Sequence, residues 1–261
     1  MPLDFHKFSV FHSASEYTTS SEGVHPVIKL ICVVKRNPSL SVEEFHDHWR
    51  GRHAQLISET PGVADRIVRY EQNHRSPEDY KRGGDFDGVA IQWFDSMDDF
   101  VAMVGDPEYQ AHVAPDERAL LDLDGLVWIL TEEEEVVIPG PEQRDEPVIK
   151  LVCMVKRRPG MTIDDFHRHW RTVHSPLNCD TPSIARYFVR YERNHRARAD
   201  YDRGGSDFDG AAVEWYPSVK SFYDMIGEPA YGELIAPDED RFLDRDSLVW
   251  LLTEREETII G

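Results

Sequence analysis

The sequence predicts an α+β protein built from two βαββαβ units that pack face to face as one barrel within the chain. Three observations support this fold class. The chain repeats itself, each repeat shows strand and helix patterns in the order βαββαβ, and a sheet with helices on one face needs a partner for the other. This order is that of a ferredoxin-like unit.

A duplication runs through most of the 261 residues. The segment VIKLICVVKRNPSLSVEEFHDHW, which starts at Val27, returns at Val148 as VIKLVCMVKRRPGMTIDDFHRHW. One inserted residue, Ser206, separates the later parts, in which APDE and LVW also recur. We therefore predict an N-terminal extension (1–26), a first unit (27–138), a linker (139–147) and a second unit (148–261).

Each element of the first unit follows from its local pattern. VIKLICVVK is short, apolar and β-branched, as is typical of a buried strand. Ser41, with Glu44 three residues later, predicts the start of a helix that ends before Pro61. IVRYEQNH and FDGVAIQWF predict two strands, SMDDFVAMVG and PDERALLDL predict helices, and LVWILTE predicts the last strand. The acidic segments EEEEVVI and EREETII, after the last strand of each unit, are candidates for arms that cross onto the opposite unit.

Charge and composition exclude several classes of function. The chain has 29 Lys and Arg against 49 Asp and Glu, a net charge of −20, which would repel nucleic acid and anionic membranes. No export signal is visible, and no stretch approaches the roughly 20 apolar residues that span a bilayer. Cys32, Cys153 and Cys179 lack the spacing of a metal site and are odd in number, which favours reduced thiols in the cytoplasm.

The segment FHDHWRGRHAQL carries the first candidate site residue. On an ideal helix Phe45, Trp49, His53 and Leu56 share one face, so His53 is expected to be buried. A buried imidazole needs a hydrogen-bond partner, and it is either a packed structural group or an acid or base tuned for chemistry. The same arrangement recurs in the second unit with Phe166, Trp170, His174 and Leu177.

The second strand supplies a partner for this histidine. Tyr70 shares a strand face with Gln72 and His74, so helix and sheet could bring His53 and Tyr70 together across a pocket. Tyr191 is the equivalent partner of His174. A phenol can donate a hydrogen bond to a developing oxyanion while an imidazole moves the proton, and such a pair needs no metal or organic cofactor.

Further residues are candidates for binding a substrate. Trp49 and Trp170 lie on the buried helix face, and His74 and His195 end the second strand, where each is either a surface residue or a pocket acid. Gln92 and Glu214 are equivalent positions on the third strand. An inward Glu214 would be a base with a raised pKa, although an outward, solvated glutamate is the commoner case. His46 and His48 diverge on a helix and are a poor pair of metal ligands.

These motifs resemble those of the EthD family of the dimeric α+β barrel superfamily. The resemblance rests on Phe-x3-Trp-x3-His in the first helix, a Tyr on the next strand and the dipeptide DG before the third strand. It implies ferredoxin-like units paired into a barrel, with a pocket between sheet and helices. The motif histidine then falls on His53 and His174, and the tyrosine on Tyr70 and Tyr191. Relatives include cofactor-free isomerases, polyketide cyclases and dehydratases, and the name-giving members act in ether degradation. Heme-binding branches of the superfamily leave a heme-ligating histidine as an open alternative.

Two functions remain as hypotheses. The first is a cofactor-independent lyase or isomerase, dehydratase-like or cyclase-like, acting on a small aromatic or polyketide-like carbonyl compound. The alternative is a non-catalytic small-molecule binding or accessory protein of a degradation pathway. Neither involves nucleic acid or a membrane, and a homodimer of the tandem chain is compatible with both. Because Pro176 follows His174 closely, we expect His174 and Tyr191 to be more active than His53 and Tyr70.

Overall fold

The computed structural model describes residues 27–132, 134–140 and 148–261. The expected N-terminal extension and most of the expected linker lie outside the described residues. The first repeat contains β1 (Ile28–Val34), α1 (Val42–His48), a π-helical turn (Trp49–His53), α2 (Ala54–Glu59), α3 (Pro61–Ala64), β2 (Arg69–Arg75), α4 (Pro77–Tyr80), β3 (Gly88–Phe94), α5 (Met97–Val104), a π-helical turn (Tyr109–Val113), α6 (Ala114–Leu120), a 3₁₀ turn (Leu123–Gly125), β4 (Val127–Thr131) and β5 (Glu135–Ile138).

The second repeat has the same order of elements. It contains β6 (Ile149–Val155), α7 (Ile163–His169), a π-helical turn (Trp170–His174), α8 (Ser175–Asp180), α9 (Pro182–Ala185), β7 (Arg190–His195), α10 (Arg198–Arg203), β8 (Gly210–Tyr216), α11 (Val219–Ile226), a π-helical turn (Tyr231–Ile235), α12 (Ala236–Phe242), a 3₁₀ turn (Arg245–Ser247) and β9 (Val249–Ile260).

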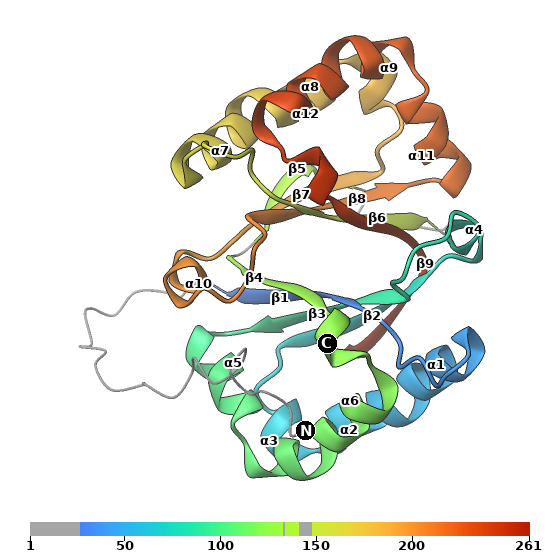
Figure 1. Cartoon of the computed structure of the whole chain (residues 1–261), viewed down its shortest axis with the longest axis vertical. Helices are drawn as coiled ribbons and strands as arrows, with labels where there is room; N and C mark the ends of the chain where they lie inside the picture. The colour runs from blue at the N-terminus through green and yellow to red at the C-terminus, as the bar shows by residue number, and fades with distance from the viewer. Residues whose placement is uncertain (1–26, 133, 141–147) are drawn as a thin grey trace.

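The two sheets pack face to face between two outer layers of helices (Figure 1). Their strands form one antiparallel array in the order β4-β1-β3-β2-β9-β6-β8-β7-β5. The apolar cluster between the sheets draws on both repeats, with Ile31 and Val89 from the first and Val152 and Val213 from the second. The predicted α+β barrel within one chain is therefore confirmed.

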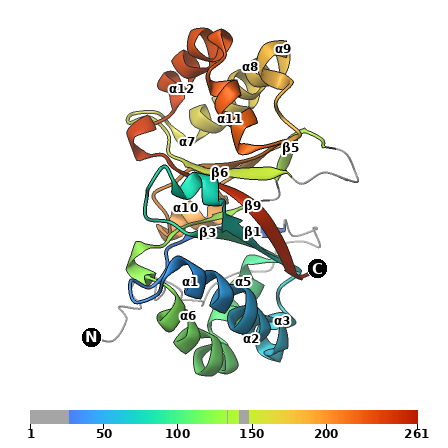
Figure 2. The same cartoon turned by 90° about the vertical axis from the view of Figure 1, so that its right-hand side faces the viewer.

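The last strand of each repeat crosses onto the other repeat, as the acidic segments suggested. The first part of β9 pairs with β6 of its own repeat and the second part with β2 of the first repeat. Reciprocally, β5 follows β4 and pairs with β7. Figure 2 shows β9 running from one sheet to the other. These arms cover strand edges that would otherwise be open, and they join the repeats into one array.

Buried ion pairs connect the repeats inside the barrel. Lys29 Nζ lies 3.3 Å from Glu192 Oε2, and its counterpart Lys150 Nζ lies 3.1 Å from Glu71 Oε2. All four residues are buried. Each lysine of the VIKL motif therefore neutralises a buried glutamate in the second strand of the opposite repeat.

The helix that carries His53 begins as the sequence predicts but continues differently. Ser41 and Glu44 form the expected capping box. After α1, however, the π-helical turn Trp49–His53 has more residues per turn than an α-helix, which rotates the positions that follow it. Ala54 and Ile57 are therefore the buried residues of α2, whereas Leu56, expected on the buried face, is half-buried.

Candidate active site

A cavity of about 540 Å³ lies between the sheet and the helices of the first repeat. Much of its lining is apolar, with Leu30, Val34, Phe100, Met103 and Leu126 among the wall residues. Its polar lining groups include His53, Tyr70, Gln92, Tyr109 and Glu117. A mostly apolar cavity with a few converging polar groups is typical of a small-molecule site.

His53 is held by a carboxylate from another helix. Its Nδ1 lies 3.1 Å from Oδ2 of Asp116, a residue in the first turn of α6. The other oxygen of Asp116 contacts His48 Nε2 at 2.8 Å and Arg52 Nε at 3.0 Å. Because a carboxylate only accepts hydrogen bonds, the proton of a neutral His53 lies on Nδ1, and Nε2 is left to accept one.

The environment keeps Asp116 ionised. Burial alone would raise the pKa of this carboxyl, but the hydrogen bonds from His53 and His48 outweigh burial and lower the pKa below its usual value. An ionised Asp116 can stabilise a positive charge on His53 after proton transfer. The pair therefore has the arrangement of an oriented general base.

Tyr70 lines the same cavity. Its oxygen accepts hydrogen bonds from Trp49 Nε1 and Gln72 Nε2, each at 3.2 Å. Two donors on the oxygen leave the hydroxyl proton to be donated elsewhere. Burial raises the pKa of Tyr70 well above its usual value, so the phenol stays protonated. His53 and Tyr70 thus line one cavity, and each is held by partners of its own.

Trp49 reaches Tyr70 because the third strand begins with glycine. A Cβ on Gly88 would lie 2.5 Å from Cζ3 of the Trp49 ring, so a larger residue at this position would displace the indole. Gly210 has the same relationship to Trp170 in the second repeat. This contact gives the DG motif a physical reason, since the glycine lets the indole lie directly on the strand.

Sequence reasoning missed Glu117, whose carboxyl-bearing side chain lines the cavity. Tyr109 Oη donates to Glu117, 2.9 Å from Oε1 and 2.8 Å from Oε2. Burial raises the pKa of Glu117, and the opposing effects of His53 and Tyr109 only partly offset it. The recurrence of APDE in both repeats was the available signal for Asp116 and Glu117. It did not predict that either residue lies near the histidine.

The second repeat builds the same framework. His174 Nδ1 lies 3.0 Å from Asp238 Oδ2, and Trp170 Nε1 donates to Tyr191 Oη at 2.8 Å. Burial would raise the pKa of Asp238, and the hydrogen bond from His174 and the nearby His169 lower it below its usual value. Both repeats therefore present an Asp–His pair and a buried Trp–Tyr pair.

The two histidines differ at Nε2. In the second repeat, Asn178 Nδ2 lies 3.2 Å from His174 Nε2, and the Phe242 ring packs at 4.8 Å from the imidazole. With the proton on Nδ1, the amide of Asn178 donates to the nitrogen that would have to act as a base. Ile57 takes the place of Asn178 in the first repeat, and it has no polar group. Leu177, expected on the buried face, packs against the core but is only partly buried, whereas Asn178 is buried after the π-helical turn.

The strand-three positions also differ between repeats. Gln92 is buried and lines the first cavity. Glu214 points inward, where burial raises its pKa to about 7 and the Tyr216 hydroxyl donates to it. The commoner outward orientation weighed for Glu214 is therefore wrong. Tyr191 Oη also has Ser175 Oγ at 3.3 Å as a hydrogen-bond partner.

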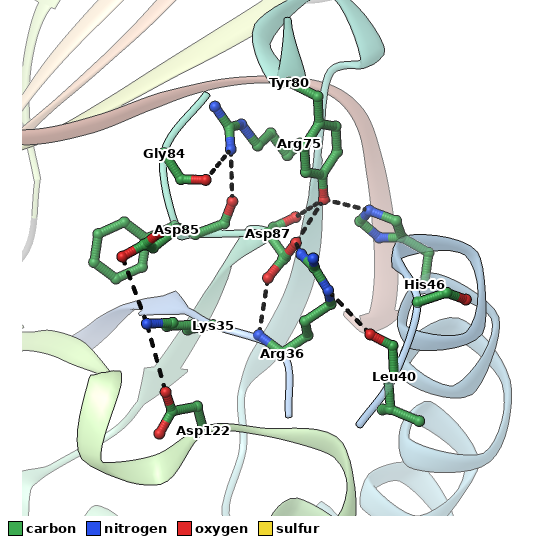
Figure 3. Close-up of polar contacts among 12 residues, drawn as sticks. Lys35, Arg36, Leu40, His46, Arg75, Tyr80, Gly84, Asp85, Asp87 and Asp122 are labelled. Atoms are coloured by element: carbon green, nitrogen blue, oxygen red, sulfur yellow. Dashed lines mark hydrogen bonds and ion pairs between the residues drawn. The ribbon is translucent and has the colours of Figure 1, made fainter. Parts of the chain in front are cut away.

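His74 and His195 are placed away from the first cavity. Each is buried and faces another imidazole, with Nδ1–Nδ1 distances of 2.8 Å for His46–His74 and 2.6 Å for His167–His195. His46 Nε2 is 3.0 Å from Tyr80 Oη, which donates to Asp87, the partner of Arg36 (Figure 3). This network fixes the loop between β2 and β3 to the first helix. Because both histidines are buried, the alternative that they are surface residues is wrong.

The described residues offer few other groups for cofactor chemistry. Across residues 27–132, 134–140 and 148–261, no three His, Cys, Asp or Glu side chains converge as a metal site. Cys32, Cys153 and Cys179 are free thiols, and burial raises the pKa of Cys32 to about 12. In the same part of the chain, no helix has the length and apolar character to cross a bilayer.

Two ferredoxin-like sheets joined face to face, with a cavity between one sheet and its helices, define a dimeric α+β barrel protein. The model of the EthD domain matches residues 37–124 and 158–246, which together make up more than half of the chain. The protein therefore belongs to the EthD family and carries two EthD domains in tandem.

Similar proteins agree with this assignment. Dehydratase aurZ of Gibberella zeae is 29% identical over 145 residues, covering 49% of this chain and 94% of that protein. The conidial pigment biosynthesis dehydratase EthD of Metarhizium robertsii is 27% identical, covering 39% of this chain and 82% of that protein.

Solved structures agree on the fold alone. A putative monooxygenase from Fusobacterium nucleatum aligns with a TM-score of 0.55 and 7% identity, covering 92% of this chain and 97% of that one. Chlorite dismutase from Candidatus Nitrospira defluvii aligns with a TM-score of 0.52 and 12% identity, covering 88% of this chain and 91% of that one.

Proposed function

We propose that the protein is a cofactor-independent, dehydratase-like lyase that acts on an aromatic or polyketide-like carbonyl compound in the cavity of the first repeat. The observation that carries this proposal is the pairing of His53 with Asp116 on the wall of a cavity that Tyr70 also lines. The names of the similar fungal proteins, which are dehydratases, support the reaction class.

The polar groups suit the loss of water from a β-hydroxy carbonyl compound. His53 Nε2 removes the proton from the carbon next to the carbonyl, while Tyr70 donates a hydrogen bond to the carbonyl oxygen as negative charge develops there. The resulting enolate expels the β-hydroxyl group, which leaves as water after taking the proton of the Glu117 carboxyl. The products are an α,β-unsaturated carbonyl compound and water, and solvent returns the proton from His53 to Glu117.

Each residue has a property that fits its role. Asp116 stays ionised and stabilises the imidazolium, Tyr70 stays protonated, and the raised pKa of Glu117 increases the fraction of neutral acid available as a donor. The apolar walls exclude water around these groups and so strengthen their electrostatic effects.

This proposal reverses the ranking of the two sites that the sequence favoured. The second repeat does have Pro176, but Asn178 occupies His174 Nε2 and Ser175 is a partner of Tyr191. In the first repeat, no hydrogen bond to His53 Nε2 is found among the described residues, and the imidazole lines the cavity. We therefore assign the reaction to His53, Tyr70 and Glu117.

The test is a panel of cyclic β-hydroxy ketones that become aromatic when they lose water. Turnover is followed by the absorbance of the conjugated product and by the loss of one water in mass spectrometry. We expect wild-type protein to convert at least one compound and His53→Ala to be strongly impaired. Saturable binding of the panel with no turnover in wild type would instead support the accessory binding role.

A further inference from the structure

We infer that residues 204–208 of the second repeat form the end wall of the first repeat's cavity and select multi-ring ligands by their length. Five consecutive residues, Gly204, Gly205, Ser206, Asp207 and Phe208, line this cavity, although they belong to the loop between α10 and β8. The inference rests on the proposed function only in taking this cavity as the substrate site.

The wall lies at the opposite end of the cavity floor from Tyr70. Tyr70 on β2 is opposite Gln92 on β3, which is opposite Leu30 on β1, which is opposite Leu130 on β4. Three strand spacings therefore separate Tyr70 from β4, a distance of about 14 Å. A ligand with its carbonyl group at Tyr70 must extend across the sheet to reach β4.

Residues of the second repeat lie next to β4 in the structure. Ala197 N donates to Leu130 O at 2.9 Å, and Thr131 forms a β-bridge with Arg196. Figure 1 shows α10, which follows Ala197, beside β4. The loop 204–208 thus reaches the cavity from the side of β4, across the floor from the reacting groups.

The loop 204–208 is held in place by hydrogen bonds and by apolar packing. Arg196 Nη1 donates to Ser206 O at 2.6 Å, and Phe208 N donates to Ser206 Oγ at 3.2 Å. The Phe208 side chain packs against the apolar cluster between the two sheets. A wall anchored at both ends in this way can exclude a ligand that is too long.

Gly205 sets how closely the wall approaches the cavity. A Cβ on Gly205 would lie 2.9 Å from Cη2 of Trp128, a cavity-lining residue on β4, and 2.6 Å from Oδ1 of Asp200. The backbone of the loop therefore rests against the Trp128 ring. Any side chain at position 205 would have to push this ring or the loop out of its present position.

The insertion in the second repeat affects this loop alone. The corresponding loop of the first repeat lacks a counterpart of Ser206, and its glycines Gly83 and Gly84 both have left-handed φ angles, of 82° and 100°. In the equivalent loop of the second repeat, Gly204 is left-handed, with a φ of 68°, and Gly205 is not. The added residue thus gives the loop a different path, and the cavity that this path borders belongs to the other repeat.

The test measures binding, which does not depend on turnover. Hydroxylated aromatic ketones with two, three and four linearly fused rings are titrated into the full-length protein by calorimetry. Gly205→Ala should move the wall inward and weaken binding of the three-ring ketone by about tenfold, with the two-ring ketone unchanged. Deletion of Ser206 should shorten the loop and improve binding of the four-ring ketone relative to the three-ring ketone.

Gly232→Ala is the matched control, because a Cβ at that helical glycine meets no atom within 4 Å. It should leave all affinities unchanged, and thermal unfolding establishes that each variant is folded. Equal affinity ratios in wild type and in either folded loop variant would overturn the inference. If the affinity ratios shift and no ketone is dehydrated, the role of the loop in ligand selection is supported and the proposed reaction is wrong. If dehydration depends on His53 and the affinity ratios do not change, the proposed reaction is supported and the role of the loop in ligand selection is wrong.

Discussion

Asp116 Oδ2 lies 3.1 Å from His53 Nδ1, although the two residues are 63 positions apart in the sequence. The same contact, at 3.0 Å, joins Asp238 to His174. Both repeats thus hold the histidine in one tautomer, with Nε2 as the basic nitrogen. What distinguishes the repeats is the group at Nε2, which is Asn178 in the second repeat.

Replacement of the carboxylate that orients the histidine should show how much each repeat contributes to kcat. In Asp116→Asn the amide no longer holds the proton on Nδ1, so we expect kcat to fall by about 100-fold or more. Asp238→Asn makes the same change in the second repeat and should cost less than about threefold. Equal losses in the two variants would show that the repeats share the chemistry.

The Tyr70 hydroxyl should affect turnover and stability separately. Tyr70→Phe removes the donor to the developing oxyanion, and we expect kcat to fall by about 100-fold to 1,000-fold. It also leaves Trp49 Nε1 without its acceptor, at a cost of about 1–3 kcal/mol in the free energy of unfolding. Tyr191→Phe removes the acceptor of Trp170 in the same way. Chemical denaturation should show a similar loss of stability in both variants, while only Tyr70→Phe loses activity.

Glu117 should govern the alkaline limb of the pH–rate profile. Burial raises its pKa, and the proposed role needs the protonated form, so the rate should fall as pH rises through that pKa. Glu117→Gln should lower the maximum rate and remove this limb. Glu239→Gln, its counterpart, should leave the profile unchanged. An unaltered alkaline limb in Glu117→Gln would rule out Glu117 as the acid.

The buried histidine pairs should make the fold sensitive to acid. Burial lowers the pKa of His46 to about 4 and that of His167 to about 3, from an ordinary value of 6.5. As the pH falls below 6.5, these histidines therefore bind protons in the unfolded chain but not in the folded chain. The free energy of unfolding decreases until the pH reaches the pKa of the folded state.

Denaturant titrations between pH 4 and pH 7 test this effect (the window set by the folded and ordinary His46 pKa values). His46→Gln and His167→Gln should flatten the dependence of stability on pH in this range. His112→Gln replaces an exposed histidine and should leave the dependence as it is in wild type. A wild-type stability that is constant across the range would contradict the proposed linkage.

The barrel could be predicted because it rests on patterns that are local or repeated. The duplication, the capping box at Ser41 and the alternating faces of YEQNH each determine part of the fold without long-range information. The arms could be proposed because their acidic segments follow the last strand of both repeats, and the pairing of β9 with β2 confirms them.

The site was predicted less completely because it depends on tertiary packing. An ideal helix places Leu56 and Leu177 inward, but the π-helical turns bring Ile57 and Asn178 to the buried face. No local pattern announces such a turn. The contact of Asp116 with His53 likewise depends on how α6 packs across the first helix. The loop around Ser206 is visible as an insertion, yet only the closed barrel shows that it borders the other repeat's cavity.

The central claim is that the first repeat carries the chemistry and the second does not. Once a β-hydroxy ketone that is turned over has been found, kcat of His53→Ala and His174→Ala should be measured on that compound, with thermal unfolding to establish that both variants are folded. We predict a loss of about 100-fold or more for His53→Ala, because the general base is removed, and a loss of less than about tenfold for His174→Ala. A loss for His174→Ala as large as that for His53→Ala, or larger, would contradict this account.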